Sequence, residues 1–283
     1  MHFTKMEGIG NDYVYVNGLT ETLPDDLPAL AVRMSRTHFG CASDGLILIL
    51  PSDKADFRMQ MFNNDGSESG MCGNGIRCVA KYCRDRGLTS KTEFTVETGS
   101  GVKTLLCTLD AKGRVSAVRV DMGGPVLEGA KIPSRFAGCP VTGAQLRAGG
   151  QDWAVTLVNV GNPHAVTFID CDPADAPVES VGPALERDPA FPEKCNIEFA
   201  QVLDRAHVKM RVWERGTGET LACGTGACAV AVAAMLNGLI EREAEISLRG
   251  GKLRIRWDEA DNHVYMTGPA RFVYDGVWLC DEE

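Results

Sequence analysis

The chain has 283 residues, with 44% apolar side chains, 24% charged side chains and a formal net charge of −9. This composition is typical of a globular protein with one large or two average domains, and an acidic chain without a Lys/Arg cluster disfavours nucleic-acid binding. The first residues lack the apolar core of a signal peptide, and the longest apolar run, 227–236, is too short to span a bilayer. We therefore expect a cytoplasmic protein without a membrane partner.

The eleven cysteines favour reduced thiols, since their number is odd and no export signal is visible. The chain has no Cys-x-x-Cys pair, which argues against a zinc site, and we expect no metal. Five cysteines are expected to be ordinary core or surface residues: Cys107, Cys139, Cys171, Cys195 and Cys280.

The first half of the chain predicts a strand at 57–62, a polar loop, and then a helix at 73–86. Apolar residues at i, i+3, i+4 and i+7 indicate this helix, which ends at Gly87. Three strands joined by tight turns follow it: 92–97, 102–109 and 114–121.

The second half repeats this order, with a strand at 208–213, a loop, a helix at 224–236 and three further strands. Those strands are expected at 244–248, 252–257 and 263–267. The helix is apolar on every face, so it must be enclosed by other elements. Corresponding features lie about 150 positions apart, which indicates an internal duplication.

Between the two halves, the pattern predicts a hairpin of strands 153–160 and 165–169 and a short helix at 178–186; residues 134–151 give no clear signal. We predict an α+β fold of two pseudo-symmetric domains. Each would be a curved, mostly antiparallel sheet or barrel around a central helix. The N-terminal domain would comprise 1–120 plus 270–283, and the C-terminal domain 121–269.

A Cys-Gly-x-Gly segment opens each of the two main helices, at Cys72 and at Cys223, and a polar residue precedes each cysteine by nine positions, Asn63 and Glu214. Amide groups at a helix start bind anions and lower the pKa of a nearby thiol. Two such segments could hold an amino-acid carboxylate with its α-carbon between two sulfurs. One thiolate would remove the α-proton while the opposite thiol returned one to the other face, without an imine-forming cofactor.

At these residues the sequence closely resembles diaminopimelate epimerase, over nearly the whole chain. Besides the two cysteine segments, the resemblance is carried by the motifs Lys5-Met6-Glu7-Gly8-Ile9-Gly10-Asn11-Asp12, Gly161-Asn162-Pro163-His164 and Phe191-Pro192-Glu193-Lys194-Cys195-Asn196. The resemblance implies a cofactor-independent homodimer that interconverts L,L- and meso-diaminopimelate in lysine and cell-wall precursor synthesis.

It also implies roles for individual residues. Cys72 and Cys223 would be the acid/base pair, and His164 and Glu214 would lie near the reacting amino group and tune the site. The carboxylate at the reacting centre would be held by Gly73, Asn74, Gly224 and Thr225. The rest of the substrate, mostly its distal end, would be read by Asn11, Asn63, Asn162, Asn196 and Arg215.

One loop departs from the family pattern Gly-x-Gly-Ala-Asp-Gly, because Gly40-Cys41-Ala42-Ser43-Asp44-Gly45 has Ala42 in place of a glycine. In some members a glutamine that borders the site takes the position of Asp44, so substrate contact by Asp44 stays open.

The sequence leaves three other functions open. The same scaffold could racemise another amino acid. Cys72 and Cys223 could instead cycle through a disulfide in a thiol redox protein, or the chain could bind an amino acid without turnover.

Overall fold

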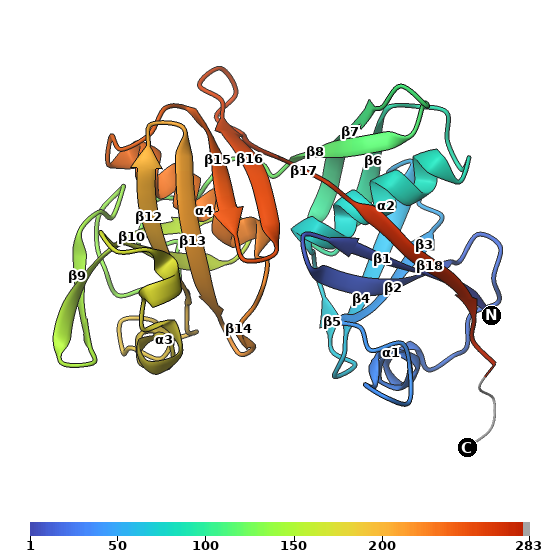
Figure 1. Cartoon of the computed structure of the whole chain (residues 1–283), viewed down its shortest axis with the longest axis horizontal. Helices are drawn as coiled ribbons and strands as arrows, with labels where there is room; N and C mark the ends of the chain where they lie inside the picture. The colour runs from blue at the N-terminus through green and yellow to red at the C-terminus, as the bar shows by residue number, and fades with distance from the viewer. Residues whose placement is uncertain (280–283) are drawn as a thin grey trace. The chain divides into compact units, whose positions relative to one another are not determined.

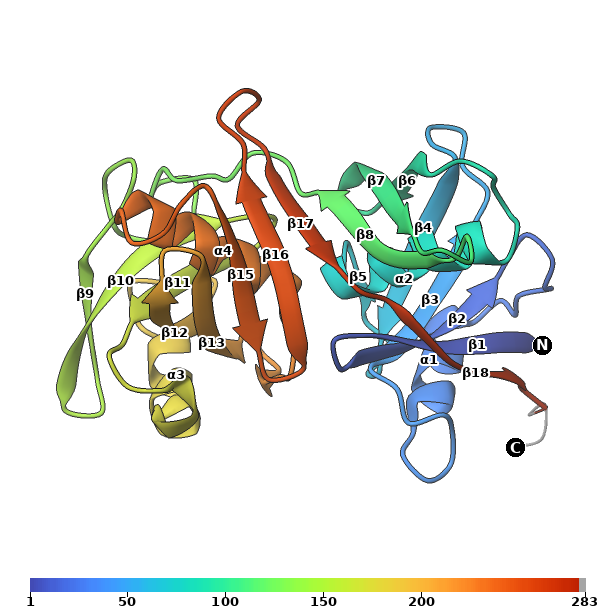
Figure 2. The same cartoon turned by 45° about the horizontal axis from the view of Figure 1, so that its top comes forward.

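The computed structural model describes residues 1–279, which divide into two compact units. Unit 1 comprises Met1–Val120 and the C-terminal segment from Gly268, and unit 2 comprises Asp121–Thr267. In both units, helices lie against the strands of their own unit (Figures 1 and 2). The predicted α+β class is confirmed.

Unit 1 is built from nine strands and two α-helices within the described residues. In chain order they are β1 (His2–Gly8), β2 (Asn11–Asn17), α1 (Leu27–Ser35), β3 (Gly45–Leu50), β4 (Phe57–Asn63), β5 (Glu68–Ser69), α2 (Gly73–Asp85), β6 (Glu93–Thr98), β7 (Gly101–Leu109), β8 (Val115–Asp121) and β18 (Arg271–Val277).

Unit 2 contains the remaining elements of the described chain. They are β9 (Ala144–Ala148), β10 (Gln151–Asn159), β11 (Pro163–Phe168), a short 3₁₀ helix η1 (Pro173–Asp175), α3 (Val178–Glu186), β12 (Asn196–Asp204), β13 (His207–Glu214), β14 (Gly218–Glu219), α4 (Gly224–Leu236), β15 (Glu243–Leu248), β16 (Gly251–Trp257) and β17 (Val264–Gly268).

The two units share one strand order. Unit 1 runs β18-β1-β2-β3-β4-β6-β7-β8, and unit 2 runs β9-β10-β11-β12-β13-β15-β16-β17. In both, the third and fourth strands pair in parallel, as do the fifth and sixth, while the other neighbours are antiparallel. A parallel pair needs a crossover connection, which α1 and α2 supply in unit 1 and α3 and α4 in unit 2. The duplication therefore extends over the whole sheet.

The long helices α2 and α4 are central to their units, as their sequence patterns predict. The apolar positions Ile76, Val79, Ala80 and Cys83 of α2 are fully buried. In α4 every residue from Ala227 to Ala234 is fully buried. Burial of a whole helix surface explains why α4 lacks a polar face.

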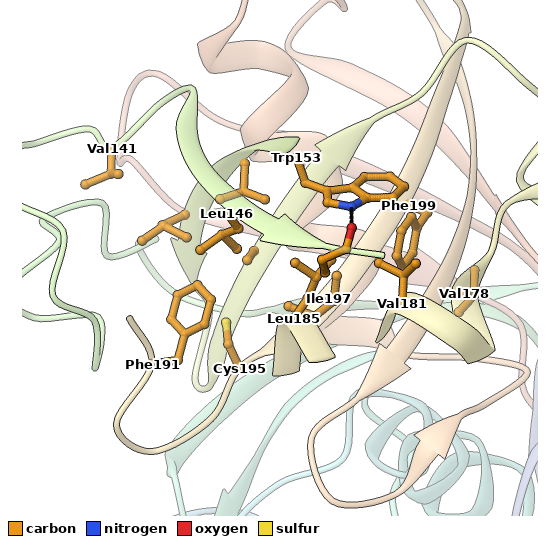
Figure 3. Packing of buried hydrophobic residues seen from close by; sticks show 14 of the residues in the cluster. Val141, Leu146, Trp153, Val178, Val181, Leu185, Phe191, Cys195, Ile197 and Phe199 are labelled. Carbon is orange, nitrogen blue, oxygen red and sulfur yellow. Dashed lines mark hydrogen bonds between the residues drawn. The ribbon is translucent and has the colours of Figure 1, made fainter. Parts of the chain in front are cut away.

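A second hydrophobic core in unit 2 lies on the face of the sheet that packs against α3 (Figure 3). Trp153 meets Phe199 edge to face, with ring centroids 5.4 Å apart, and the Trp153 indole N–H donates to the carbonyl of Ala148 at 3.1 Å. Val181 and Leu185 of α3 complete this core. The α3 core fixes the strands that carry several of the candidate site residues, β11, β12 and β13.

Several elements have no counterpart among the predicted ones, and helix α1 and strand β9 are two of them. Helix α1 is capped by Asp26, whose carboxylate accepts the Ala29 N–H at 2.9 Å, and it buries Leu30 and Met34 against β3 and β4. Strand β9 lies in the segment that gave no clear signal. Among residues 1–279, no helix is both long and apolar enough to cross a membrane.

Candidate active site

Cys72 caps the N-terminus of α2 in unit 1. Its backbone is extended, and its Sγ accepts the Gly75 N–H at 3.3 Å, while the Ile76 N–H makes the first helical bond to the Cys72 carbonyl at 2.9 Å. An α-helix supplies no acceptor for the N–H groups of its first two positions, which here are Gly73 and Asn74. The sulfur therefore lies beside an amide-rich helix start.

Asn11, at the start of β2, contacts this sulfur directly. The Cys72 thiol donates to Asn11 Oδ1 at 3.3 Å, and Asn11 Nδ2 donates to Asp44 Oδ2 at 2.6 Å. Sequence patterns alone did not bring these three residues together. The structure thus places Asn11 at the cysteine itself.

Asn63 and Asn74 lie on either side of the loop that leads to Cys72. Asn74 is the second residue of α2 and is buried. Asn63 ends β4, where its Nδ2 donates to the Ser67 hydroxyl at 3.0 Å and its Cα partner across the strands is Gly45. Asn63 is therefore next to the Asp44–Gly45 turn.

Cys223 caps α4 in unit 2 with the same geometry. Its Sγ accepts the Gly226 N–H at 3.3 Å, and the Ala227 N–H bonds to the Cys223 carbonyl at 3.0 Å. The Thr225 hydroxyl lies 3.5 Å from the sulfur. Two segments with a common sequence pattern thus form one local structure twice.

The second glycine of each motif leaves room for this structure. A methyl group at Gly75 would lie 2.6 Å from Ile47 Cδ1, and one at Gly226 would lie 3.0 Å from Glu198 Oε1 and 3.2 Å from Cys223 Sγ. These distances are shorter than ordinary contacts, so Gly75 is constrained by packing against Ile47, and Gly226 by packing against Glu198 and the Cys223 sulfur.

Glu214 lies beside Cys223 and contributes to the pKa of the Cys223 thiol. The Glu214 carboxylate accepts a hydrogen bond from the Thr220 hydroxyl. Burial raises the pKa of Glu214, and this hydrogen bond opposes the rise. Burial also raises the pKa of Cys223 well above its ordinary value, and the charges of Glu214 and Glu198 add to that rise. The environment therefore favours the thiol form of Cys223.

His164 forms a buried chain with two other side chains. Its Nδ1 lies 2.6 Å from Glu198 Oε1, and its Nε2 lies 2.9 Å from Asn162 Oδ1. Both His164 and Glu198 are completely inaccessible to solvent. Burial raises the pKa of Glu198, and the adjacent imidazole opposes that rise. His164 lies within β11, opposite Val158 of β10, rather than in the turn between two hairpin strands.

Asn196 connects this chain to the Glu214 segment. Asn196 lies beside His164 in the parallel β11–β12 pair, donates to the Pro163 carbonyl at 2.7 Å and accepts the Arg215 N–H at 2.8 Å. The exposed Arg215 guanidinium donates to the Glu193 carbonyl at 3.1 Å. The structure therefore brings Asn162, His164 and Asn196 together, and Asn196 joins them to the backbone beside Glu214.

The sequence reasoning missed Glu198, although it carried a signal. A carboxylate stands there in an otherwise apolar run, Ile197-Glu198-Phe199-Ala200. Lys, Glu, Arg and Asp are almost never fully buried unless they are paired. A buried partner was therefore to be expected, and it is His164.

The departure at Ala42 leaves the glycine-like backbone in place. Ala42 has φ of 50°, in the left-handed region that favours glycine. Its carbonyl accepts a hydrogen bond from the buried Lys5 Nζ at 2.8 Å, and the Cys41 carbonyl accepts another at 3.0 Å. Lys5 thus holds the loop in spite of the side chain at position 42.

No disulfide joins the other cysteines of the described chain. Of the five cysteines predicted to be ordinary core or surface residues, Cys107 and Cys195 are buried and Cys139 and Cys171 are exposed, and Cys280 lies outside the described residues. Burial raises the pKa of Cys78, in α2, to about 12. No group of three or more His, Cys, Asp or Glu side chains among residues 1–279 is arranged to hold a metal ion.

Several solved structures share this fold. The chain aligns over 99% of its length with a probable proline racemase from Agrobacterium radiobacter, with 93% of that chain covered, a TM-score of 0.72 and 14% identity. A hydroxyproline epimerase from Agrobacterium vitis gives a TM-score of 0.71 at 15% identity, with 98% of this chain and 91% of that chain covered. A phenazine biosynthesis protein from Bacillus anthracis gives 0.70 at 17% identity, with 99% of both chains covered. At these identities the likeness shows the fold alone.

The fold, together with the family match and the curated relatives described next, defines an isomerase of the amino-acid racemase and epimerase class. Sequence comparison is more specific. The family model for diaminopimelate epimerase matches residues 3–128 and 156–273. The chain is 52% identical over 281 residues to the diaminopimelate epimerase of Moorella thermoacetica, covering 99% of this chain and 100% of the relative. It is 49% identical over 278 residues to that of Methanococcus maripaludis, covering 98% and 99%. The chain belongs to the diaminopimelate epimerase family.

Proposed function

We propose that this enzyme interconverts L,L- and meso-diaminopimelate, with Cys72 and Cys223 as the two groups that exchange protons with the substrate α-carbon. The observation that carries the proposal is the repeated geometry of the two cysteines. Each thiol caps a helix and accepts the N–H of the third residue after it at 3.3 Å. Identical placement of two titratable thiols is what a reaction with two equivalent directions requires.

In this mechanism one sulfur is a thiolate and the other a thiol when substrate binds. The thiolate takes the α-proton, so that the electron pair of the C–H bond passes into the carboxylate as an enolate. The opposite thiol then gives its proton to the other face of the α-carbon. The two sulfurs exchange protonation states, and the reaction neither gains nor loses a proton.

The helix starts would stabilise the negative charge that develops on the carboxylate. Backbone N–H groups at Gly73, Asn74, Gly224 and Thr225 are the donors that we assign to it. Such groups are fixed before reaction, and preorganised donors of this kind are usually the largest single contribution to catalysis. General acid–base transfer by the thiols adds about 10²–10⁴-fold.

The remaining polar residues would bind the substrate and tune the site. We assign Asn11, Asn63, Asn162, Asn196 and Arg215 to substrate recognition. Glu214 and His164 would lie near the reacting amino group and tune the site. Their support is the clustering of Glu214, His164, Asn162 and Asn196 by hydrogen bonds and strand pairing around the Cys223 helix start.

The substrate is tested by incubating the enzyme with L,L-diaminopimelate in D₂O and following the α-proton resonance by NMR. We expect loss of the α-proton signal together with formation of the meso isomer. A parallel incubation with L-proline and L-lysine serves as the control. Exchange on one of these amino acids, with none on diaminopimelate, would contradict the assignment and favour a racemase of another substrate.

We further propose that the enzyme acts in the cytoplasm as a homodimer. The family resemblance supports this, and β18 offers an apolar surface for subunit contact, with Val273 and Val277 54% and 51% exposed. Sedimentation equilibrium of the native chain and of Val273→Asp tests the oligomeric state. A monomer at micromolar concentration in the native chain would contradict it.

A further inference from the structure

A chain of hydrogen bonds in unit 1 begins at the carboxylate of Asp44 and ends at the sulfur of Cys72. Asp44 Oδ2 lies 2.6 Å from Asn11 Nδ2, and Asn11 Oδ1 lies 3.3 Å from Cys72 Sγ. In this chain the Asn11 amide lies between Asp44 and the sulfur. Asp44 therefore acts on Cys72 through the Asn11 amide when it acts along these two hydrogen bonds.

The direction of these bonds follows from a backbone group. Asp44 Oδ2 also accepts the Asp12 N–H at 3.0 Å. A backbone N–H can only donate, and an ionised carboxylate can only accept, so the Asp44 carboxylate accepts both bonds at Oδ2. Asn11 must therefore present its NH₂ group to Asp44, and this orientation leaves only its carbonyl oxygen to face Cys72.

Asp44 is itself held firmly. Its backbone N–H donates to the Asp12 carbonyl at 2.8 Å. The loop before it is fixed by Lys5, which is 4% exposed, donates to the carbonyls of Cys41 and Ala42, and pairs with the Asp12 carboxylate. Burial raises the pKa of Asp44, and the bond from the Asp12 N–H opposes that rise. The Asp44 carboxylate is therefore a fixed acceptor for the NH₂ group of Asn11.

We propose that Asp44 is a positioning residue that locks the Asn11 amide with its oxygen toward Cys72, so that the thiol form of Cys72 is favoured. The inference rests on the proposed role of Cys72 and adds a residue to that site. A hydrogen bond that a group donates while protonated stabilises its protonated form. A reversed Asn11 amide would offer N–H to the sulfur and would stabilise the thiolate instead.

This bond opposes the effect of the helix start. The Gly75 N–H, which points at Cys72 Sγ, favours the thiolate, as helix N-termini generally do. Asn11 adds a preference for the thiol. Together they keep both protonation states accessible, as an acid/base group that alternates between them requires.

The other titratable and charged groups around these residues come from three elements packed together in unit 1. They are Lys5 and Glu7 of β1, Asp12, Tyr13 and Tyr15 of β2, and Arg77 and Cys78 of α2. Asp44→Ala and Asp44→Asn remove the same negative charge from beside these groups. A comparison of the two variants with each other therefore holds this background constant.

The test compares Asp44→Ala with Asp44→Asn. Both remove the charge of Asp44, but only Asp44→Ala removes the acceptor. In the native chain both donors meet the same oxygen, Oδ2, so one amide oxygen in D44N can accept both. The readout is the rate of Cys72 carbamidomethylation by iodoacetamide from pH 5 to 10, resolved by peptide mass spectrometry. Cys223, alkylated in the same samples, is the internal control.

We expect D44A to move the half-maximal pH of Cys72 alkylation down by about half to one pH unit. D44N should keep the native value, and Cys223 should keep its value in both variants. Equal shifts in D44A and D44N would show a charge effect and overturn the proposal, as would no shift in D44A. If D44A does not fold, D44N alone decides, because a shifted half-point there contradicts the hydrogen-bond account.

Alkylation does not depend on turnover, so the two proposals fail separately. The same preparations are assayed for α-proton exchange with diaminopimelate. Absence of exchange in the native chain, with the expected alkylation pattern, would refute the epimerase and leave the role of Asp44 intact.

Discussion

Gly226→Ala tests whether the second glycine of the Cys223 motif is required by the space around the sulfur. The added methyl group would lie 3.0 Å from Glu198 Oε1 and 3.2 Å from Cys223 Sγ, whereas ordinary contacts begin at 3.4 Å. Glu198 cannot yield easily, because it is fully buried and lies 2.6 Å from His164 Nδ1. The sulfur must therefore move by a few tenths of an ångström.

The expected loss of rate follows from that displacement. A misplacement of about 1 Å costs about 10²-fold in rate, so a shift of a few tenths is expected to cost about fivefold to tenfold. The change in stability is smaller than usual for overpacking. Overpacking costs about 1–3 kcal/mol, but replacing glycine by alanine in a helix returns about 0.8–1 kcal/mol.

The assay is the rate of diaminopimelate α-proton exchange, with urea denaturation measured in parallel. Gly75→Ala is the matched control, since its methyl group would meet Ile47 Cδ1 at 2.6 Å but Cys72 Sγ only at 3.5 Å. We expect G75A to lose mainly stability and G226A mainly rate. Full activity in G226A, or a larger loss of rate in G75A, would refute the steric account of the motif.

Three further predictions concern single sites. Ile47→Val removes Cδ1, the atom that a methyl group at Gly75 would meet, so I47V should restore at least part of the stability lost in G75A. A double-mutant cycle by urea denaturation measures this coupling, and additive losses of stability would contradict it. Ala42→Gly should stabilise the chain by about 0.5–1 kcal/mol, because the strain relieved in the left-handed backbone exceeds the cost of the unfolded chain's greater conformational entropy. A lower midpoint of urea denaturation would count against this prediction. Glu214→Gln removes a negative charge that adds to the raised pKa of Cys223, so the half-maximal pH of Cys223 alkylation should fall, and an unchanged or higher value would be inconsistent with this electrostatic effect.

The helices at the two cysteines were predictable because their signals are local. The predicted helix at 224–236 has the bounds of α4, and the one at 73–86 exceeds α2 by a single residue. Periodicity, a following glycine and the Cys-Gly-x-Gly opening all lie within each segment. The predicted strands that follow each helix match β6–β8 and β15–β17 within one residue at each end.

Elements whose signals are weak or distant were not predictable. Helix α1 has only nine residues and contains Pro28 in its first turn, which fits a helix start as well as a loop. Strand β18 gains its place from pairing with β1, at the other end of the chain. No local pattern reports a partner so far away in sequence.

The site residues divide in the same way, into those with a local sequence signal and those that depend on distant contacts. The two cysteines could be recognised from the repeat, since both copies are visible in the sequence. The link from Asp44 through Asn11 to Cys72 joins three separate segments, so only the folded unit reveals it. The pairing of His164 with Glu198 likewise depends on the register of the parallel strands β11 and β12.

The central claim is that both sulfurs transfer protons at one carbon. It is tested most directly by the deuterium content of substrate and product when native enzyme, Cys72→Ala and Cys223→Ala act on L,L-diaminopimelate in D₂O, sampled at low conversion. Two bases predict that the meso product of the native enzyme carries solvent deuterium while the remaining substrate does not. Each single variant should lose at least about 10²-fold in epimerisation. A variant that retains native turnover, or a meso product that keeps the original proton, would contradict the account.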